Sequence, residues 1–106
     1  MFDIKITGND DRKCTIEISG EIDIYSGPDF RTRLYSIISE EEKDLVLDLC
    51  NLNYIDSMGL GILVGALKRV KEQKHDIIIL NPQNTVRKLF RITGLDKVFV
   101  IKENVS

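Results

Sequence analysis

The sequence is poor in the residues on which metal centres and cross-linked domains depend. Its 106 residues include one histidine and two cysteines. Two cysteines are too few for the disulfide framework of a small secreted domain. No Cys/His set has metal-ligand spacing. We therefore expect neither a metal site nor a cofactor.

The sequence also lacks long apolar runs and a strong excess of either charge. No apolar run approaches the ~20 residues that span a membrane. The net charge of −2, from 15 basic and 17 acidic residues, lacks the basic excess of nucleic-acid-binding proteins. The opening residues carry Asp3 and Lys5, so they contain no signal-peptide core. We expect a cytoplasmic protein that binds neither nucleic acid nor a membrane.

The composition that remains is that of an ordinary folded domain. Hydrophobic residues make up 42% of the chain and charged residues 30%, with no linker, repeat or low-complexity segment. A chain of this length fits one domain, so we expect residues 1–106 to form a single domain. Cys14 and Cys50 each lie in an apolar, strand-like stretch, which predicts buried free thiols.

The first third of the chain predicts a hairpin followed by a helix. Two runs of alternating apolar and polar residues, separated by a turn at residues 8–11, are typical of half-exposed strands. Residues 20–25 form a short irregular connection. A helix then starts with Ser26 as a hydroxyl cap, Pro28 and an acid at Asp29. The alternating apolar residues are Phe2, Ile4 and Ile6, then Cys14, Ile16 and Ile18.

The rest of the chain alternates strands with helices. Residues 45–50 are almost continuously apolar, as in a central parallel strand buried on both faces. A loop at 51–55 leads to a helix capped by Asp56 that runs to about Lys74. The next strand is 77–80. A third helix begins at Asn84 or Thr85 and ends at Gly94, before a strand at 98–101 and a tail at 102–106.

This order predicts an α/β fold with a mixed sheet, opened by an N-terminal hairpin and covered by helices. The most informative stretch, residues 55–61, lies where the central strand and its loop lead into the second helix. Ser57 is expected there as the first helical residue, with its hydroxyl at the rim of the sheet.

The second helix also has an unusual face away from its core stripe. Gly59, Gly61 and Gly65 each cost roughly 1 kcal/mol relative to alanine inside a helix. Either a neighbouring element of the same domain or another protein approaches this helix closely, and the sequence favours neither. The residues at helical spacing on this face are Met58, Gly61, Ile62 and Gly65.

The spacing of these residues argues against a catalytic site. A serine-nucleophile elbow needs glycine two positions before the serine, where this chain has Ile55. The only histidine, His75, is expected at the far end of the same helix, well over ~20 Å from Ser57. Dinucleotide and P-loop fingerprints are absent. A divalent-ion cluster of Asp23, Asp48 and Asp56 is disfavoured because Asp48 is expected on a strand. We expect a protein that is not an enzyme.

Several motifs resemble the anti-sigma factor antagonists, which are single STAS domains of bacterial partner-switching systems. The resemblance covers nearly the whole chain, and its most specific element is the Asp-Ser-x-Gly-Leu-Gly that begins at Asp56. The matching segments are GEID at 20–23, LVLDL at 45–49, YIDSMGLG at 54–61 and VRKLF at 86–90, with Gly94, Leu95 and Phe99.

The resemblance implies a phosphorylation switch. In such proteins the serine of that element is phosphorylated by an anti-sigma factor that is itself an ATP-using serine kinase. The unmodified antagonist binds this kinase and frees a sigma factor, and a phosphoserine phosphatase resets the cycle. The phosphoacceptor falls on Ser57, and its acidic neighbours fall on Asp23 and Asp56. The partner contact is then expected at Tyr25, Ser26, Met58, Gly59, Gly61, Ile62 and Gly65.

Two other functions remain open from the sequence. The first is a STAS switch module in a pathway without a sigma factor, which would share the Ser57 chemistry and bind a different kinase. The second is a ligand-sensing or nucleotide-sensing domain. The chain also differs from many relatives at Met58, where they carry a small or hydroxyl residue, so a larger apolar contact is expected there.

Overall fold

The sheet of this protein is built around one long strand that pairs with three others. A computed structural model describes residues 1–103. Strand β1 (Phe2–Asn9) forms the expected antiparallel hairpin with β2 (Lys13–Ile22). The first half of β2 pairs in parallel with β3 (Asp44–Asp48), and its end pairs with β4 (Leu52–Ile55).

Two further strands complete the sheet. Strand β5 (Ile77–Leu80) lies parallel to β3, and β6 (Val100–Lys102) lies parallel to β5. The strand order is β1-β2-β3-β5-β6, with β4 attached to β2 alone. The mixed α/β sheet opened by a hairpin is therefore confirmed.

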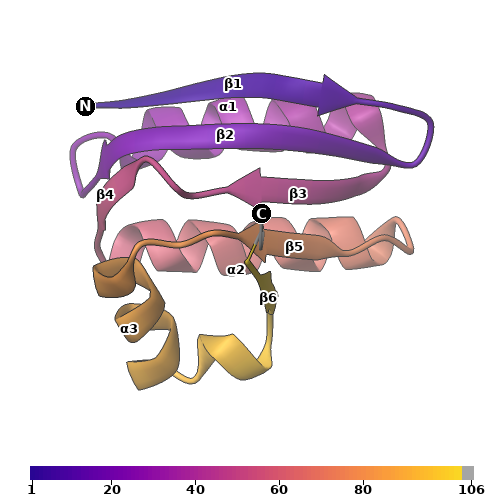
Figure 1. Cartoon of the computed structure of the whole chain (residues 1–106). Helices are drawn as coiled ribbons and strands as arrows, with labels where there is room; N and C mark the ends of the chain where they lie inside the picture. Colours follow the sequence, from indigo (N-terminus) through magenta and orange to yellow (C-terminus); the bar gives the residue numbers. More distant parts are fainter. Residues whose placement is uncertain (104–106) are drawn as a thin grey trace.

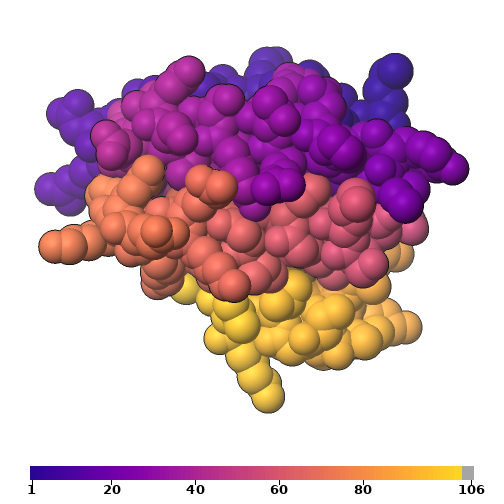
Figure 2. Space-filling model, turned by 180° about the vertical axis from the view of Figure 1, so that it is seen from behind, coloured from indigo at the N-terminus to yellow at the C-terminus, as the bar shows by residue number. Residues whose placement is uncertain are grey.

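Two long helices cover the same face of this sheet. Helices α1 (Gly27–Glu41) and α2 (Ser57–Glu72) lie behind the strands in Figure 1, and Figure 2 shows them from the back, side by side across the molecule. The shorter α3 (Asn84–Ile92) and the 3₁₀ helix η1 (Leu95–Lys97) extend below them. Within residues 1–103, no helix covers the front face of the sheet.

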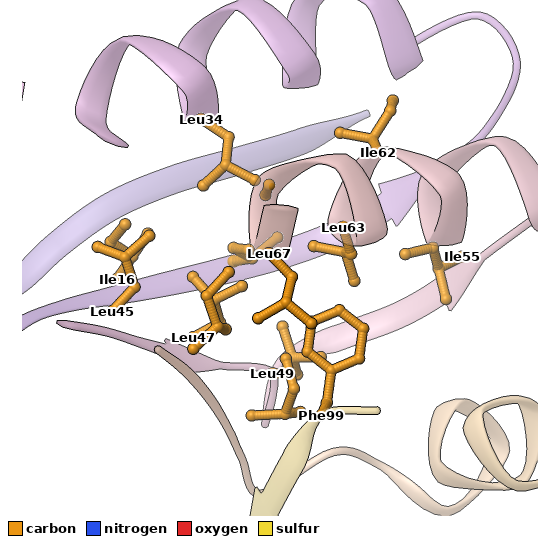
Figure 3. Packing of buried hydrophobic residues seen from close by; sticks show 14 of the residues in the cluster. Ile16, Leu34, Leu45, Leu47, Leu49, Ile55, Ile62, Leu63, Leu67 and Phe99 are labelled. Atoms are coloured by element: carbon orange, nitrogen blue, oxygen red, sulfur yellow. The ribbon is translucent and has the colours of Figure 1, made fainter. Parts of the chain in front are cut away.

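The hydrophobic core lies between the sheet and these helices. Figure 3 shows Leu34 of α1 and Leu63 and Leu67 of α2 above strand residues such as Ile16 and Leu47. Burial of aliphatic side chains on this scale is the main favourable term in folding. Leu45, Val46 and Leu47 are all buried, so the prediction of a central strand buried on both faces is confirmed.

The loop predicted at residues 51–55 is wrong, because residues 52–55 form β4. Leu52 and Ile55 are buried while Asn53 and Tyr54 between them are exposed, so β4 lacks the alternation that reveals a strand in sequence. The irregular connection predicted at 20–25 is also partly wrong. Strand β2 continues to Ile22, past a register shift at Gly20, where φ is +88°.

Several predicted ends are also shifted. Helix α3 begins at Asn84, but Gln83 occupies its N-cap and makes no side-chain hydrogen bond there. Gly94 has the expected left-handed conformation, with φ of +77°. The chain then forms η1 before β6, so the last strand is 100–102 rather than 98–101. The predicted tail at 102–106 starts inside β6, and its last three residues lie outside the described residues.

The two cysteines differ in their environments. Cys14 is fully buried on β2, as expected. Cys50 lies just after β3 rather than within it, and it is only partly buried. No helix in residues 1–103 is long and apolar enough to cross a bilayer.

Candidate functional site

Parallel pairing at the ends of β2 and β4 brings two acidic residues to one edge of the sheet. Ile22 and Ile55 are register partners, and each is followed at once by an aspartate, Asp23 and Asp56. The backbone N–H of Asp56 donates to the carbonyl oxygen of Ile22 at 3.2 Å. Asp23 and Asp56, the two predicted neighbours of Ser57, therefore follow the ends of two adjacent parallel strands. Binding sites of α/β folds commonly lie at this carboxyl edge of the sheet.

Asp56 caps helix α2, as the sequence predicts. Its backbone is extended, and its carboxylate Oδ1 accepts from the backbone N–H of Gly59 at 3.0 Å. This bond satisfies one of the N–H groups that have no partner inside the helix. Ser57 is the first residue of α2, and its side chain is exposed to solvent. An enzyme can therefore reach its hydroxyl without unfolding the domain.

Asp23 is held rigidly by the loop between β2 and α1. Its Oδ1 accepts from the backbone N–H groups of Tyr25 and Ser26, both at 3.0 Å, and from the Ser26 hydroxyl at 3.1 Å. The backbone hydrogen bond from Ser26 is the main reason that the pKa of Asp23 lies below its ordinary value. Asp23 therefore presents a fixed negative charge beside the start of α2.

Ser26 does not cap α1 as predicted. Its side chain makes no cap hydrogen bond, and its backbone is already helical. The hydroxyl instead accepts from the backbone N–H of Asp23 at 3.0 Å and donates to the carboxylate of the same residue. Ser26 is half-buried by these contacts, so it supports Asp23 rather than offering a free contact surface.

Large apolar side chains are exposed around these two acids. Tyr25 is 91% exposed and Ile24 is 60% exposed. Ile24 was not singled out in the sequence, because nothing distinguishes it there from a core residue. An open depression of about 600 Å³ lies beside Tyr25. It is lined by Met1, Phe2, Asp23, Tyr25, Ser26 and Asp29.

Met58 forms a second exposed apolar feature, next to Ser57. It is 41% exposed, and its side chain lies over Gly27 at the start of α1. A Cβ atom at Gly27 would meet the Met58 sulfur at 2.6 Å, so a larger residue here would displace the methionine side chain. A hollow of about 170 Å³ lies here, lined by Pro28, Arg31, Met58 and Ile62. The sequence did not single out Gly27 or Arg31.

The glycines of α2 have different neighbours. Gly59 is buried against Ile55 and Ile22, and a Cβ on Gly65 would collide with the Tyr35 hydroxyl. Close approach by the same domain therefore explains both. Gly61 is exposed with no neighbouring atom within 4 Å of such a Cβ. Packing within residues 1–103 does not explain it.

Burial corrects part of the predicted contact face. Gly59 lies on the buried face of α2, against Ile22 and Ile55, and Ile62 is 8% exposed because α1 packs beside it. Neither offers a surface to another protein. Gly65 is partly covered by Tyr35, whose hydroxyl donates to the carbonyl oxygen of Ile62 at 2.9 Å. Tyr25, Met58 and Gly61 are the predicted contact residues that are exposed.

The remaining reactive residues lie elsewhere. His75 follows α2 and contacts Asp44, with its Nδ1 3.3 Å from the carboxylate. Asp48 ends β3, and its Oδ1 accepts from the backbone N–H of Cys50 at 3.1 Å. Among residues 1–103, no three His, Cys, Asp or Glu side chains are grouped closely enough to hold a metal ion.

These features define a class: a small mixed α/β domain, helix-covered on one face, with an exposed serine at the start of a helix on the carboxyl edge of the sheet. The model of the STAS domain family matches residues 2–106. The chain belongs to the STAS domain family.

The chain is also similar to two staphylococcal proteins that share one name. The chain is 31% identical over 100 residues to a protein of Staphylococcus aureus (strain NCTC 8325 / PS 47) named "Anti-sigma-B factor antagonist", covering 94% of this chain and 93% of that protein. It is 33% identical over 91 residues to a Staphylococcus epidermidis protein of the same name, covering 86% and 84%.

Solved structures show the same fold. The unphosphorylated form of the anti-sigma factor antagonist SpoIIAA matches with a TM-score of 0.80 at 22% identity, covering all of this chain and 90% of that one. The phosphorylated form from Bacillus matches with a TM-score of 0.73 at 21% identity, covering 100% and 93%. At these identities the likeness establishes the STAS fold.

Proposed function

We propose that this chain is an anti-sigma factor antagonist controlled by phosphorylation of Ser57. Its unphosphorylated form binds an anti-sigma factor that is an ATP-using serine kinase, and this binding releases a sigma factor. A phosphoserine phosphatase restores the binding form. The observation that carries the proposal is the exposed Ser57 at the first position of α2, beside the capping carboxylate of Asp56. Residues 1–106 act as one domain in the cytoplasm and catalyse no reaction themselves.

The local charges explain how a phosphate would end binding. A phosphoserine carries about −1.5 to −2 charges at neutral pH. On Ser57 it would join the carboxylates of Asp23 and Asp56, which already hold negative charge at this edge. A partner surface that fits the uncharged serine would then face three negative groups. Like-charge repulsion and the cost of removing water from the phosphate both oppose binding.

The same position allows the domain to keep its fold when modified. The N-terminus of a helix tolerates an anion, since its dipole and free N–H groups favour negative charge. SpoIIAA is described in both unphosphorylated and phosphorylated forms, and both share the fold of this chain. These facts support a switch that acts at the interface.

The contact surface that follows from exposure differs from the one expected from sequence. It consists of Tyr25, Met58 and Gly61, extended by Ile24, with Gly65 at its margin. Large, rigid aromatic side chains such as that of Tyr25 commonly carry much of the energy of an interface. The absence of a side chain at Gly61 lets a partner approach the backbone of α2 closely, which accounts for a glycine that packing leaves unexplained.

Paired baits test the proposal directly. Ser57→Ala and Ser57→Asp proteins would be used to capture binding proteins from a lysate of the source cells, followed by mass spectrometry. We expect the alanine bait to capture an ATP-binding kinase that the aspartate bait does not. Ser36→Asp is the matched control, because Ser36 is also an exposed helical serine but lies on α1. This control should capture the kinase.

Capture of the same proteins by both Ser57 baits, or of no kinase by either, would contradict the proposal. The captured kinase's own partners would separate a sigma-factor pathway from another switching pathway.

The depression beside Tyr25 lies in the size range of small-molecule sites, about 300–1,000 Å³, so a ligand-sensing domain is the second candidate. Nucleotide binding measured by calorimetry, without any protein partner, would favour it.

A further inference from the structure

The front face of the sheet, opposite α1 and α2, carries two ordered rows of side chains. The first, here the apolar row, runs across four strands through register partners: Thr15, Val46, Ile78 and Val100. The second, here the charged row, runs through Glu17, Asp48, Leu80 and Lys102. The row between them, which includes Ile16, Leu47 and Ile79, is fully buried against the helices, so these two rows face the other way.

The lack of a helix over this face, within the described part of the chain, is unusual for parallel strands. β3, β5 and β6 pair in parallel, and parallel sheets are almost always covered on both faces. Here helices cover one face, and the other carries Val46, Ile78, Leu80 and Val100 with no helix over them in residues 1–103. Val46 is 7% exposed in the centre, while Val100 at the edge is 42% exposed.

We infer that this face binds a second copy of the chain, sheet against sheet, through a two-fold axis. Two sheets pack face to face about 10 Å apart with nearly aligned strands. A two-fold axis between them, parallel to the strands and midway between β3 and β5, places β3 on β5 of the second copy and β2 on its β6. Val46 then faces Ile78 of the second copy, and Ile78 faces Val46.

Charge complementarity at the two ends of the charged row favours this arrangement, although the same axis places Asp48 opposite Leu80 of the second copy. The same axis places Glu17 opposite Lys102 of the second copy, and symmetry repeats the contact. Within one copy these two residues are three strand spacings apart, about 14 Å, so they cannot pair internally. Neither has an ion-pair partner within 4 Å in residues 1–103, although Lys5 is the cross-strand neighbour of Glu17 on β1. The second copy supplies the missing partner for both.

One row further along, the arrangement brings like charges together. Asp44 begins β3 and Asp76 immediately precedes β5, at equivalent positions of the register, so Asp44 would face Asp76 of the second copy and Asp76 would face its Asp44. Each already has a contact in its own copy: the Lys71 amine lies 3.3 Å from the Asp76 carboxylate, and Asp44 accepts from the backbone N–H of Asp76 at 2.9 Å and lies 3.3 Å from His75 Nδ1. These internal contacts offset part of the repulsion between the two carboxylates, and the apolar row and the Glu17–Lys102 contacts oppose the rest.

Charge exchange tests the geometry with the protein alone. Dimerisation of the whole chain would be measured by sedimentation equilibrium, and the fold of each variant checked by circular dichroism. Glu17→Lys and Lys102→Glu each place two pairs of like charges in the dimer, so each should raise the dimer Kd by about tenfold or more. The double variant Glu17→Lys/Lys102→Glu should return to within about threefold of the wild-type Kd.

Mixing the two single variants gives the sharpest result. A mixed dimer of Glu17→Lys with Lys102→Glu has two attractive contacts, whereas either variant alone has two repulsive ones. Restored dimerisation on mixing is expected for the two-fold arrangement. Chains that stay monomeric up to about 1 mM, or a dimer that neither single variant weakens, would overturn the inference, as would mixing without restoration.

A second pair of variants separates this face from other exposed apolar positions. Val100→Lys places a charge in the apolar row and should abolish the dimer. Ile92→Lys is its matched control, because Ile92 is 67% exposed but lies at the end of α3, away from both rows. Equal loss of dimer in both variants would place the contact elsewhere and overturn the inference.

Discussion

At the scale of single residues, the two neighbours Asp56 and Ser57 have different roles: Asp56 caps α2, and Ser57 is the proposed phosphorylation site. Asp56 completes the start of α2 by accepting from the N–H of Gly59, so the helix does not depend on the serine side chain. Ser57 is exposed to solvent and makes no contact on which the start of the helix depends. The chemistry of the site and the stability of the helix are therefore separable, although the two residues are adjacent.

This separation predicts the effect of Ser57→Asp on stability. An acid at the first helical position gains from the helix dipole and loses from repulsion by Asp56, and the two effects are of similar size. We expect the free energy of unfolding to change by less than about 1 kcal/mol, which is a shift of under roughly 4–8 °C in Tm. Thermal unfolding with Ser57→Ala as control measures it. A larger loss would mean that the charge disturbs the fold.

Asp23 has a predictable response to pH. Its pKa is lowered in the folded state, chiefly by the backbone hydrogen bond from Ser26. A group with a lowered folded pKa contributes stability above its unfolded pKa, which is about 3.9, and loses it as the pH falls through the folded value. Ser26→Ala removes the hydroxyl that donates to the carboxylate, so the pKa of Asp23 should rise.

A carboxyl-detected NMR titration of the wild type and Ser26→Ala gives both pKa values. Thr32→Ala is a suitable control, because that hydroxyl bonds a backbone carbonyl within α1 and does not contact Asp23. An Asp23 pKa that is the same in wild type and Ser26→Ala would show that the backbone donors alone set it.

The sequence predicts the central residues of the candidate site but not their contacts. Ser57, Asp56 and Asp23 follow from a motif and a capping preference, both of which are local. The hydroxyl of Ser26 was assigned to the wrong partner, because the cap and the Asp23 bond need the same residue type at the same position. Gly27 and Arg31 are visible only once α1 and α2 lie together, so no local signal marks them.

At the scale of elements, helix α2 shows that its glycines have separate causes. The glycine spacing had suggested one face for one purpose. In the structure, Gly59 admits Ile55 and Gly65 admits Tyr35, while Gly61 faces solvent. The sequence left open whether a neighbouring element or another protein approaches these glycines. A neighbouring element explains Gly59 and Gly65, and it does not explain Gly61.

Alanine substitutions in α2 should consequently have opposite effects. Gly59→Ala brings a Cβ within 2.5 Å of Ile55 Cγ1, and overpacking of this kind costs about 1–3 kcal/mol. Gly61→Ala meets no atom within 4 Å and should gain about 1 kcal/mol from its helix propensity. Urea unfolding measures both. Effects of the same sign would show that the helix responds to alanine generally rather than to local space.

Strand β4 illustrates what the sequence could not predict about elements. It is four residues long, pairs only with the end of β2 and has exposed residues in its middle, so it has neither length nor alternation. Its existence depends on the register shift at Gly20, which allows β2 to pair with two strands in turn. This pairing joins residues some thirty positions apart in the chain, so no local sequence pattern indicates it.

At the scale of the whole molecule, the two proposed surfaces lie on different parts of the fold. Ser57 and its neighbours follow the ends of β2 and β4, while the apolar and charged rows lie on the front face of the sheet, the charged row at the carboxyl ends of β3, β5 and β6. The fold class was predictable because strand and helix periodicities alternate clearly along the chain. The helix-free front face was not, since the sequence predicted helices covering the sheet without saying on which side.

This separation predicts that the two surfaces act independently. Ser57→Asp should leave the dimer Kd unchanged within about twofold, and Lys102→Glu should leave the rate of Ser57 phosphorylation by the captured kinase unchanged. Sedimentation and a phosphorylation time course measure the two effects. A change in either would show that the second copy covers the edge as well as the face.

The position of Met1 has a practical consequence for such experiments. Its carbonyl oxygen accepts from the N–H of Glu21 at 2.9 Å, and its side chain borders the depression that Asp23 and Tyr25 line. A folded protein fused to this end would lie close to the proposed contact surface and would block access to it. A protease site in the junction would turn the fusion into a caged antagonist, inactive until cut, with every residue of the domain unchanged.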